Sequence, residues 1–118
     1  MSAPDWILVA LGGSVGACAR FGVGLLVTGR GWPAAVGTGI VNVVGCAAIG
    51  FLYARTEDPT LRLGLGVGVL GGFTTFSSFG RETLELVQGG RIELGIVSVA
   101  LNLGLGLAGA WVGQRVAG

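Results

Sequence analysis

Histidine is absent from this sequence, and charged residues are scarce. The 118 residues include no histidine, and the charged types make up 11% of the chain, well below the roughly 25% that is usual for soluble domains. Without histidine, imidazole metal sites and acid–base catalysis by histidine are excluded. The net charge of +1 offers no basic surface to nucleic acid, so no nucleic-acid partner is expected.

Cysteine is also rare, with two residues in the chain. Cys18 and Cys46 each stand alone within an apolar segment. We interpret them as small packing residues rather than as a disulfide or a pair of metal ligands. No spacing in the sequence resembles a nucleophile motif or a side-chain metal motif, so neither an enzyme nor an organic cofactor is expected.

Long apolar segments are what the sequence has instead. Hydrophobic residues make up 52% of the chain, and the mean hydropathy is +0.82. Four apolar segments, each close to the roughly 20 residues that cross a bilayer, are separated by short polar turns. The sequence therefore predicts an all-α membrane protein in which residues 1–118 form a single four-helix transmembrane domain. The predicted helices are residues 6–28, 33–54, 63–86 and 92–114.

The third segment contains the stretch that suits lipid least, residues 71–80 (GGFTTFSSFG). A glycine costs about 1 kcal/mol against alanine inside a helix, and β-branched threonine restricts χ1. We therefore expect the helix to break near Gly71–Thr75. Irregular backbone at membrane depth persists only where it is buried in protein or lines a wet cavity, and its carbonyls can bind cations. This stretch is the predicted functional site.

One charge lies well inside the first segment. Arg20 at a bilayer centre costs at least about 2.5 kcal/mol, and less near an interface. We interpret it either as a vestibule charge that attracts anions or fixes a neighbouring helix end, or as an anchor that snorkels to the interface. Gly12 and Gly16 precede it at the spacing that lets helix backbones approach closely, and residues 64–72 repeat that glycine spacing.

Polar side chains recur on one face of the second and fourth segments. Thr38 and Asn42 are four residues apart, as are Ser98 and Asn102, so each pair shares a helical face. Lipid cannot satisfy a carboxamide, which has two donors and two acceptor sites, so Asn42 must point inward. It is interpreted either as a structural hydrogen bond between helices or as a donor offered to a bound or permeating solute.

Phe76 and Phe79 follow the predicted break three residues apart, so both rings project from one side of the helix. Ordinary core packing is one interpretation. The other is an anion path, because ring edges carry partial positive charge and conduction needs weak binding. The carboxylates, including Glu82, are expected at or beyond the membrane ends. Without a carboxylate inside the membrane, proton-coupled cation export is disfavoured, and transport of an anion is left.

The arginines are balanced between the two sides of the membrane. If the four segments span, three arginines lie on each side: residues 55, 62 and 115 on one, and residues 30, 81 and 91 on the other. Because the asymmetry of loop arginines fixes orientation, near-zero bias predicts that copies insert both ways. Four thin helices enclose little volume, so an antiparallel homodimer is the predicted assembly.

Three motifs together resemble the Fluc (CrcB) family of fluoride channels. Residues 71–79 (GGFTTFSSF) are similar to the family signature GGxTTFSTF, and residues 12–21 (GGSVGACARF) and 37–45 (GTGIVNVVG) match family motifs in the first and second helices. Order, spacing and total length agree from about residue 7 to residue 113. Two positions depart from the family pattern: Ser78 replaces the last threonine of the signature, and Ser98 replaces a frequent tyrosine.

The resemblance implies a dual-topology homodimer whose two pores pass F⁻ passively out of the cytoplasm through the plasma membrane, which relieves fluoride toxicity. It implies a structural Na⁺ at the dimer interface, bound by the backbone carbonyls of Gly71 and Thr74. The implied partners are fluoride, a second copy of the chain and the lipid bilayer. The implied pore residues are Phe76, Phe79, Asn42, Ser77, Ser78, Thr38 and Ser98, with Arg20 and Asn102 as vestibule or structural residues.

Two other hypotheses are compatible with four membrane helices. A small multidrug transporter also combines four helices with dual topology, but it uses a glutamate in its first helix, and this chain has none there. An accessory subunit of a larger membrane complex would leave the helix break unexplained.

Overall fold

A computed structural model describes all 118 residues, and the chain is helical throughout, without strands. Four helical stretches are long and apolar enough to cross a membrane: Ala3–Gly29, Ala34–Arg55, Pro59–Gln88 and Ile92–Ala117. The prediction of an all-α chain with four candidate membrane spans is confirmed. Its helix ends differ from the predicted ones by a few residues, as the fraying of helix termini leads one to expect.

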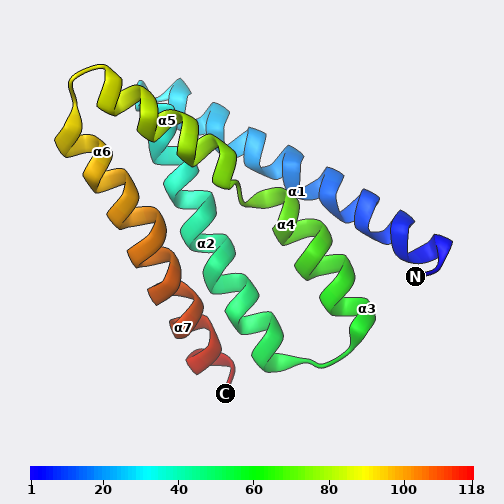
Figure 1. Cartoon of the computed structure of the whole chain (residues 1–118). Coiled ribbons are helices and arrows are strands. Elements are labelled where there is room, and N and C mark those ends of the chain that lie inside the picture. Colours follow the sequence, from blue (N-terminus) through cyan, green and yellow to red (C-terminus); the bar gives the residue numbers. More distant parts are fainter.

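The first two spans are single helices, and the last two are composite. The first span is α1 (Ala3–Gly29) and the second is α2 (Ala34–Arg55). The third consists of α3 (Pro59–Leu61), the π-helical η1 (Arg62–Leu70), α4 (Gly71–Phe73) and α5 (Phe76–Gln88), and the fourth of α6 (Ile92–Val99), the π-helical η2 (Ala100–Leu105) and α7 (Gly106–Ala117). The α1–α2 and α5–α6 turns lie at one end of the molecule, and the α2–α3 loop and the C-terminus lie at the other (Figure 1).

Glycines bring the backbone of α1 against η1 and α4. A methyl group added at Gly12 would lie 2.6 Å from the carbonyl oxygen of Gly64. One added at Gly16 would overlap the carbonyl oxygen of Val69, and one at Gly72 would overlap that of Gly13. The glycine spacings in the first and third spans therefore meet each other, as close-packed membrane helices require.

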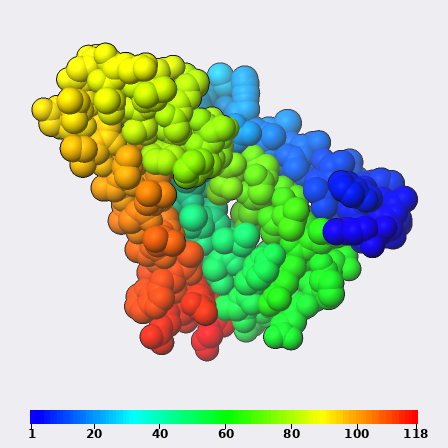
Figure 2. Space-filling view, in the orientation of Figure 1, coloured from blue at the N-terminus to red at the C-terminus, as the bar shows by residue number.

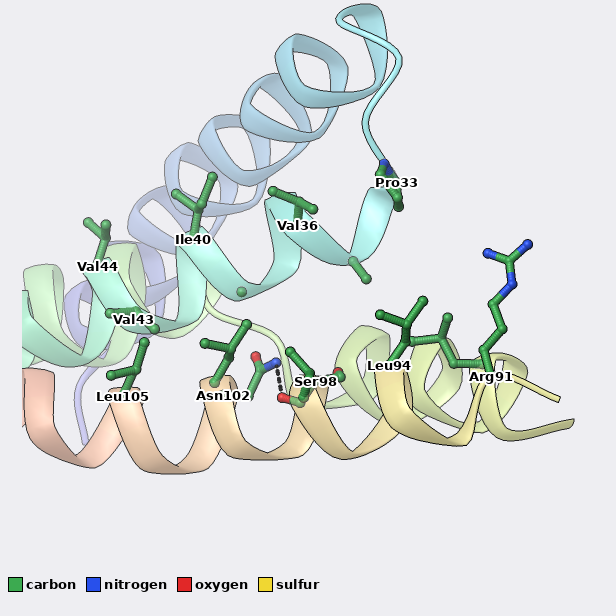
Figure 3. Close-up of a pocket in the computed structure, with 15 residues that line it drawn as sticks. Pro33, Val36, Ile40, Val43, Val44, Arg91, Leu94, Ser98, Asn102 and Leu105 are labelled. Carbon is green, nitrogen blue, oxygen red and sulfur yellow. Dashed lines mark hydrogen bonds between the residues drawn. The ribbon is translucent and has the colours of Figure 1, made fainter. Parts of the chain in front are cut away.

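A second glycine contact joins α2 to α7. A methyl group at Gly113 would overlap the carbonyl oxygen of Ala47, and one at Gly50 would overlap that of Ala110. Away from this contact, towards the α1–α2 turn, α2 and α6 diverge and leave a groove between them (Figure 3). In the space-filling view, α2 is visible between the orange and red fourth span and the green third span (Figure 2).

The third span breaks at Thr74 and Thr75, within the predicted stretch. Both residues are extended, with φ −85° and ψ 156° at Thr74 and φ −149° and ψ 118° at Thr75. Of the two predicted reasons for the break, the β-branched threonines coincide with it, whereas Gly71 and Gly72 stay helical. Gly72 serves the close contact with α1 instead, and the chain unwinds at the two β-branched residues that follow.

Candidate functional site

The side chain of Asn42 holds the broken backbone. Its Nδ2 donates to the carbonyl oxygen of Thr75 at 3.0 Å, and its Oδ1 accepts from the Thr75 N–H at 2.8 Å. These are two of the main-chain groups that the break deprives of helical partners. Asn42 is 9% exposed, so water does not compete for them. Of the two interpretations of Asn42, the structure shows the interhelical hydrogen bond.

Two further hydrogen bonds fix the helix ends on either side of the break, the end of α4 and the start of α5. The guanidinium of Arg20 donates through Nε to the carbonyl oxygen of Gly72 at 3.1 Å. The hydroxyl oxygen of Thr75 accepts from the N–H of Ser78 at 3.1 Å, which caps α5 at its N-terminus. Arg20 therefore fixes a neighbouring helix end, one of its two predicted vestibule roles.

A cavity of about 240 Å³, here called the vestibule, lies between α1, α2 and the start of α5. Four of the residues that line it can donate hydrogen bonds: Arg20, Thr38, Thr75 and Ser78. The charge of Arg20 and the hydroxyls of Thr75 and Ser78 make the vestibule suitable for a small anion, whereas Thr38 already donates its hydroxyl hydrogen to Glu82. The structure thus brings together three predicted site residues that lie up to 58 positions apart, from residue 20 to residue 78.

A second cavity, here called the phenylalanine chamber, has a volume of about 330 Å³. Phe76 and Phe79 line it together with Asn42 and Asn102. The two ring centroids are 5.3 Å apart, and the rings meet edge to face at 67°. Phe79 is 7% exposed, whereas Phe76 is 75% exposed. Thr75 lines both the vestibule and the chamber, so the helix break separates the two cavities.

Gly71 and Thr74, whose carbonyls are the predicted sodium ligands, both line the phenylalanine chamber. Among the hydrogen bonds that lie outside regular helix, none reaches either oxygen. No group of three or more histidine, cysteine, aspartate or glutamate residues could hold a metal ion. Backbone carbonyls are hard oxygen ligands of the type that alkali cations take, so these two residues fit a sodium ion as donors.

Two predicted pore residues, Ser77 and Ser98, line neither the vestibule nor the phenylalanine chamber. Ser77 is exposed and its hydroxyl is 3.3 Å from that of Thr75, but it lines none of the three main cavities. Ser98 is buried, and its hydroxyl pairs with that of Thr83 at 2.8 Å. It lines the groove between α2 and α6, a cavity of about 500 Å³ with mostly apolar walls (Figure 3).

Glu82 corrects the expectation that every carboxylate lies at a membrane end facing water. Glu82 is 8% exposed, and its Oε1 accepts from the hydroxyl of Thr38 at 2.8 Å. Its Oε2 has no hydrogen-bond partner, and Arg81 reaches Oε1 only at 3.9 Å. The carboxylate comes to lie here because Glu82 follows Phe79 by three residues and shares its buried helical face.

Sequence reasoning did not include Thr75, Thr83 or Glu82 among the site residues. Thr75 has a recognisable signal, because a threonine three residues before Ser78 at a helix start is a typical N-cap. Glu82 could be found from its spacing to Phe79. Thr83 has no such signal, since its partner Ser98 lies on the following span.

Known proteins resemble this chain over almost its whole length. Residues 7–114 match the family model described as "CrcB-like protein, Camphor Resistance (CrcB)". Three similar proteins carry the name "Fluoride-specific ion channel FluC". The protein of Solibacter usitatus is 42% identical over 118 residues, which cover 95% of this chain and 97% of that protein. The protein of Thermus thermophilus is 43% identical, with 96% and 94% covered, and that of Novosphingobium aromaticivorans is 47% identical, with 92% and 91% covered.

Proposed function

This chain belongs to the CrcB family of membrane ion channels, and on that premise we propose that it is a fluoride channel that passes F⁻ passively out of the cytoplasm. The observation that carries the proposal is the similarity of 42–47% over more than nine-tenths of the chain to proteins named as fluoride-specific channels. The family consists of channels, so the chain is not an enzyme.

Fluoride enters this path at the vestibule. The guanidinium of Arg20 uses Nε for the Gly72 carbonyl, which leaves its other N–H donors for an anion. The hydroxyl of Ser78 can replace part of the water shell of the ion. Because Arg20 is partly exposed rather than sealed in the protein, it attracts the anion without trapping it, as conduction requires.

Fluoride then passes the helix break and meets the ring edges of the phenylalanine chamber. Phe76 and Phe79 present edges whose hydrogens carry partial positive charge. Such edges bind an anion more weakly than an arginine does, which permits release. The amide of Asn42 at the chamber wall is a strong donor that an anion can reach by displacing one of its present acceptors.

The pores assemble between two antiparallel copies. Phe76 is 75% exposed, and the phenylalanine chamber is incomplete in one chain. A second copy that packs against this face would cover the ring of Phe76 and close the chamber. The balance of arginines, with three on each side of the four spans, supports insertion of the two copies in opposite orientations.

A structural Na⁺ is proposed at the interface of the two copies. The carbonyls of Gly71 and Thr74 would hold it, so two copies would offer four oxygens. When bound, the ion supplies a fixed positive charge beside the break. The chain itself prepares the site, because Arg20 and Asn42 bind the neighbouring main-chain groups and leave these two carbonyls free.

The biological consequence concerns fluoride toxicity. Hydrogen fluoride is a weak acid that crosses membranes uncharged and dissociates in a more alkaline cytoplasm, where F⁻ accumulates. A passive anion channel in the plasma membrane lets the inside-negative potential drive the ion out. The process needs no ATP.

The experiment that tests this function is fluoride efflux from liposomes. Purified protein is reconstituted into vesicles loaded with potassium fluoride or potassium chloride, and a potassium ionophore sets the voltage. We expect rapid release of F⁻ and no release of Cl⁻ above that of protein-free vesicles. Equal release of the two halides would refute fluoride selectivity, and no release of either would refute the channel.

A further inference from the structure

The side chain of Asn42 has no free N–H. One Nδ2 hydrogen binds the carbonyl oxygen of Thr75, and the other binds Oδ1 of Asn102 at 2.7 Å. A carboxamide has only these two donors. An anion that takes a hydrogen bond from Asn42 must therefore displace one of these two oxygen acceptors.

The two acceptors differ in how firmly they are held. The bond to Thr75 is one half of a two-point contact, since Thr75 also donates to Asn42, and breaking it would leave main-chain groups of the helix break without partners. The bond to Asn102 is a single contact between two side chains. Asn102 is therefore the acceptor that an anion can replace at the lower cost.

Asn102 is positioned for that exchange. It lies in η2, and its Nδ2 donates to the Ser98 carbonyl oxygen at 2.8 Å, which aims Oδ1 at Asn42. The dashed line in Figure 3 marks this bond. Asn102 is only half-buried, and it is the one residue that lines both the phenylalanine chamber and the groove of about 500 Å³ between α2 and α6. The groove gives the carboxamide space to rotate away.

We infer that Asn102 is an internal competitor of the permeating anion: its Oδ1 occupies the amide hydrogen of Asn42 until an anion displaces it. The inference rests on the proposed anion-channel function and adds a residue that sets the affinity of the chamber. A charged acceptor makes a hydrogen bond about twice as strong as a neutral one, so a halide can displace the carboxamide. Once displaced, Asn102 returns to Asn42 when the anion leaves, which keeps the amide satisfied and favours release.

The test compares fluoride efflux in liposomes for the wild type and Asn102→Leu, which keeps the approximate volume but cannot accept a hydrogen bond. The half-saturating fluoride concentration should fall about three- to tenfold, the scale of one exchanged neutral hydrogen bond. Gln114→Leu removes a carboxamide from an exposed position on the same span and should match the wild type. Asn102→Ser, whose hydroxyl is too short to reach Asn42, should repeat the fall and decides the question where Asn102→Leu does not fold.

The outcomes separate this inference from the proposed function. Efflux with an unchanged half-saturating concentration in the variants would overturn the role of Asn102 alone. The absence of fluoride efflux from the wild type would overturn the channel, and the inference with it. A separate readout is the side-chain amide of Asn42 in NMR spectra without fluoride: one of its two protons should exchange faster with solvent in Asn102→Leu, and unchanged exchange would contradict the pairing.

Discussion

Two helix contacts meet at the helix break, and they differ in composition. The glycine contact joins α1 to η1 and α4, and the polar contact joins α2 to α5 and η2. In the first, glycines such as Gly12 and Gly16 let main chain touch main chain, and little space remains. In the second, side chains such as Asn42 and Asn102 reach across gaps, and cavities lie between the helices. The glycine contact holds the main chain just before the break, and the polar contact leaves cavities beside it.

The strongest test of this contrast is Gly16→Ala, which breaks the glycine contact. The added methyl would overlap the Val69 carbonyl and lie 2.7 Å from the N–H of Phe73. We expect a loss of about 3 kcal/mol or more in unfolding free energy, seen as aggregation or a large fall in the thermal unfolding temperature in detergent. Gly22→Ala, with no atom within 4 Å of the added methyl, is the matched control. Equal stability of the two variants would mean that the helices can separate freely.

Phe79→Ile tests the polar contact at its most buried ring. The substitution removes an aromatic ring that lines the phenylalanine chamber while keeping an apolar side chain in place. Fluoride efflux should fall about tenfold or more, which corresponds to about 1.4 kcal/mol of lost anion contact. Size-exclusion chromatography should show the same assembly as the wild type.

Phe51→Ile is the control for that prediction, because Phe51 lies on α2 away from the chamber and is 43% exposed. Its efflux should equal that of the wild type. Unaltered efflux in Phe79→Ile would remove this ring from the ion path.

Thr38→Val affects the polar contact without touching the phenylalanine rings. It deprives Oε1 of the buried Glu82 of its hydroxyl donor, in addition to the Oε2 that already has none. The unfolding free energy should fall by about 1–3 kcal/mol, measured by thermal unfolding. Thr28→Val removes an exposed hydroxyl bound to the Gly24 carbonyl and should change stability little. If the two variants lose equal stability, the Thr38–Glu82 hydrogen bond contributes no more to the unfolding free energy than an exposed one.

Glu85→Gln lies outside both contacts and should have the smallest effect. Arg81 and Glu85 form an ion pair of 2.7 Å on the surface, with both side chains about 60% exposed. Solvent screens such a pair, so the unfolding free energy should change by no more than about 0.5 kcal/mol. A larger loss would show that α5 depends on its surface charges as well as on its buried face.

The glycine contact could be predicted from the sequence, and much of the polar contact could not. The spacings of Gly12 with Gly16, and of glycines within residues 64–72, identify surfaces that need a close partner, and the structure brings these surfaces together. The location of the break was predicted within residues 71–75 and assigned to its glycines and threonines together, but only the threonines are unwound. The main chain at Gly72 is held by packing against α1, and this partner is not visible in the local sequence.

The polar contact escaped prediction because it depends on distances between helices. The pair of Asn42 and Asn102 forms only because α2 and η2 approach within hydrogen-bond reach before α2 and α6 diverge. The hydrogen bond of Glu82 depends in the same way on Thr38, which belongs to a different span. Sequence spacing shows which residues share a face of one helix, but it does not show which face of another helix comes opposite.

The fastening of the break has a consequence for how the molecule can work. Asn42 makes two hydrogen bonds to the main chain of Thr75, Arg20 donates one to the carbonyl of Gly72, and Thr75 caps the helix that follows. A helix break held by this many hydrogen bonds does not act as a hinge, so we expect the two half-helices to keep their relative orientation. For the proposed channel, this arrangement predicts that ions pass by local exchange of hydrogen-bond partners within a fixed backbone, and not by the domain rocking of an alternating-access carrier.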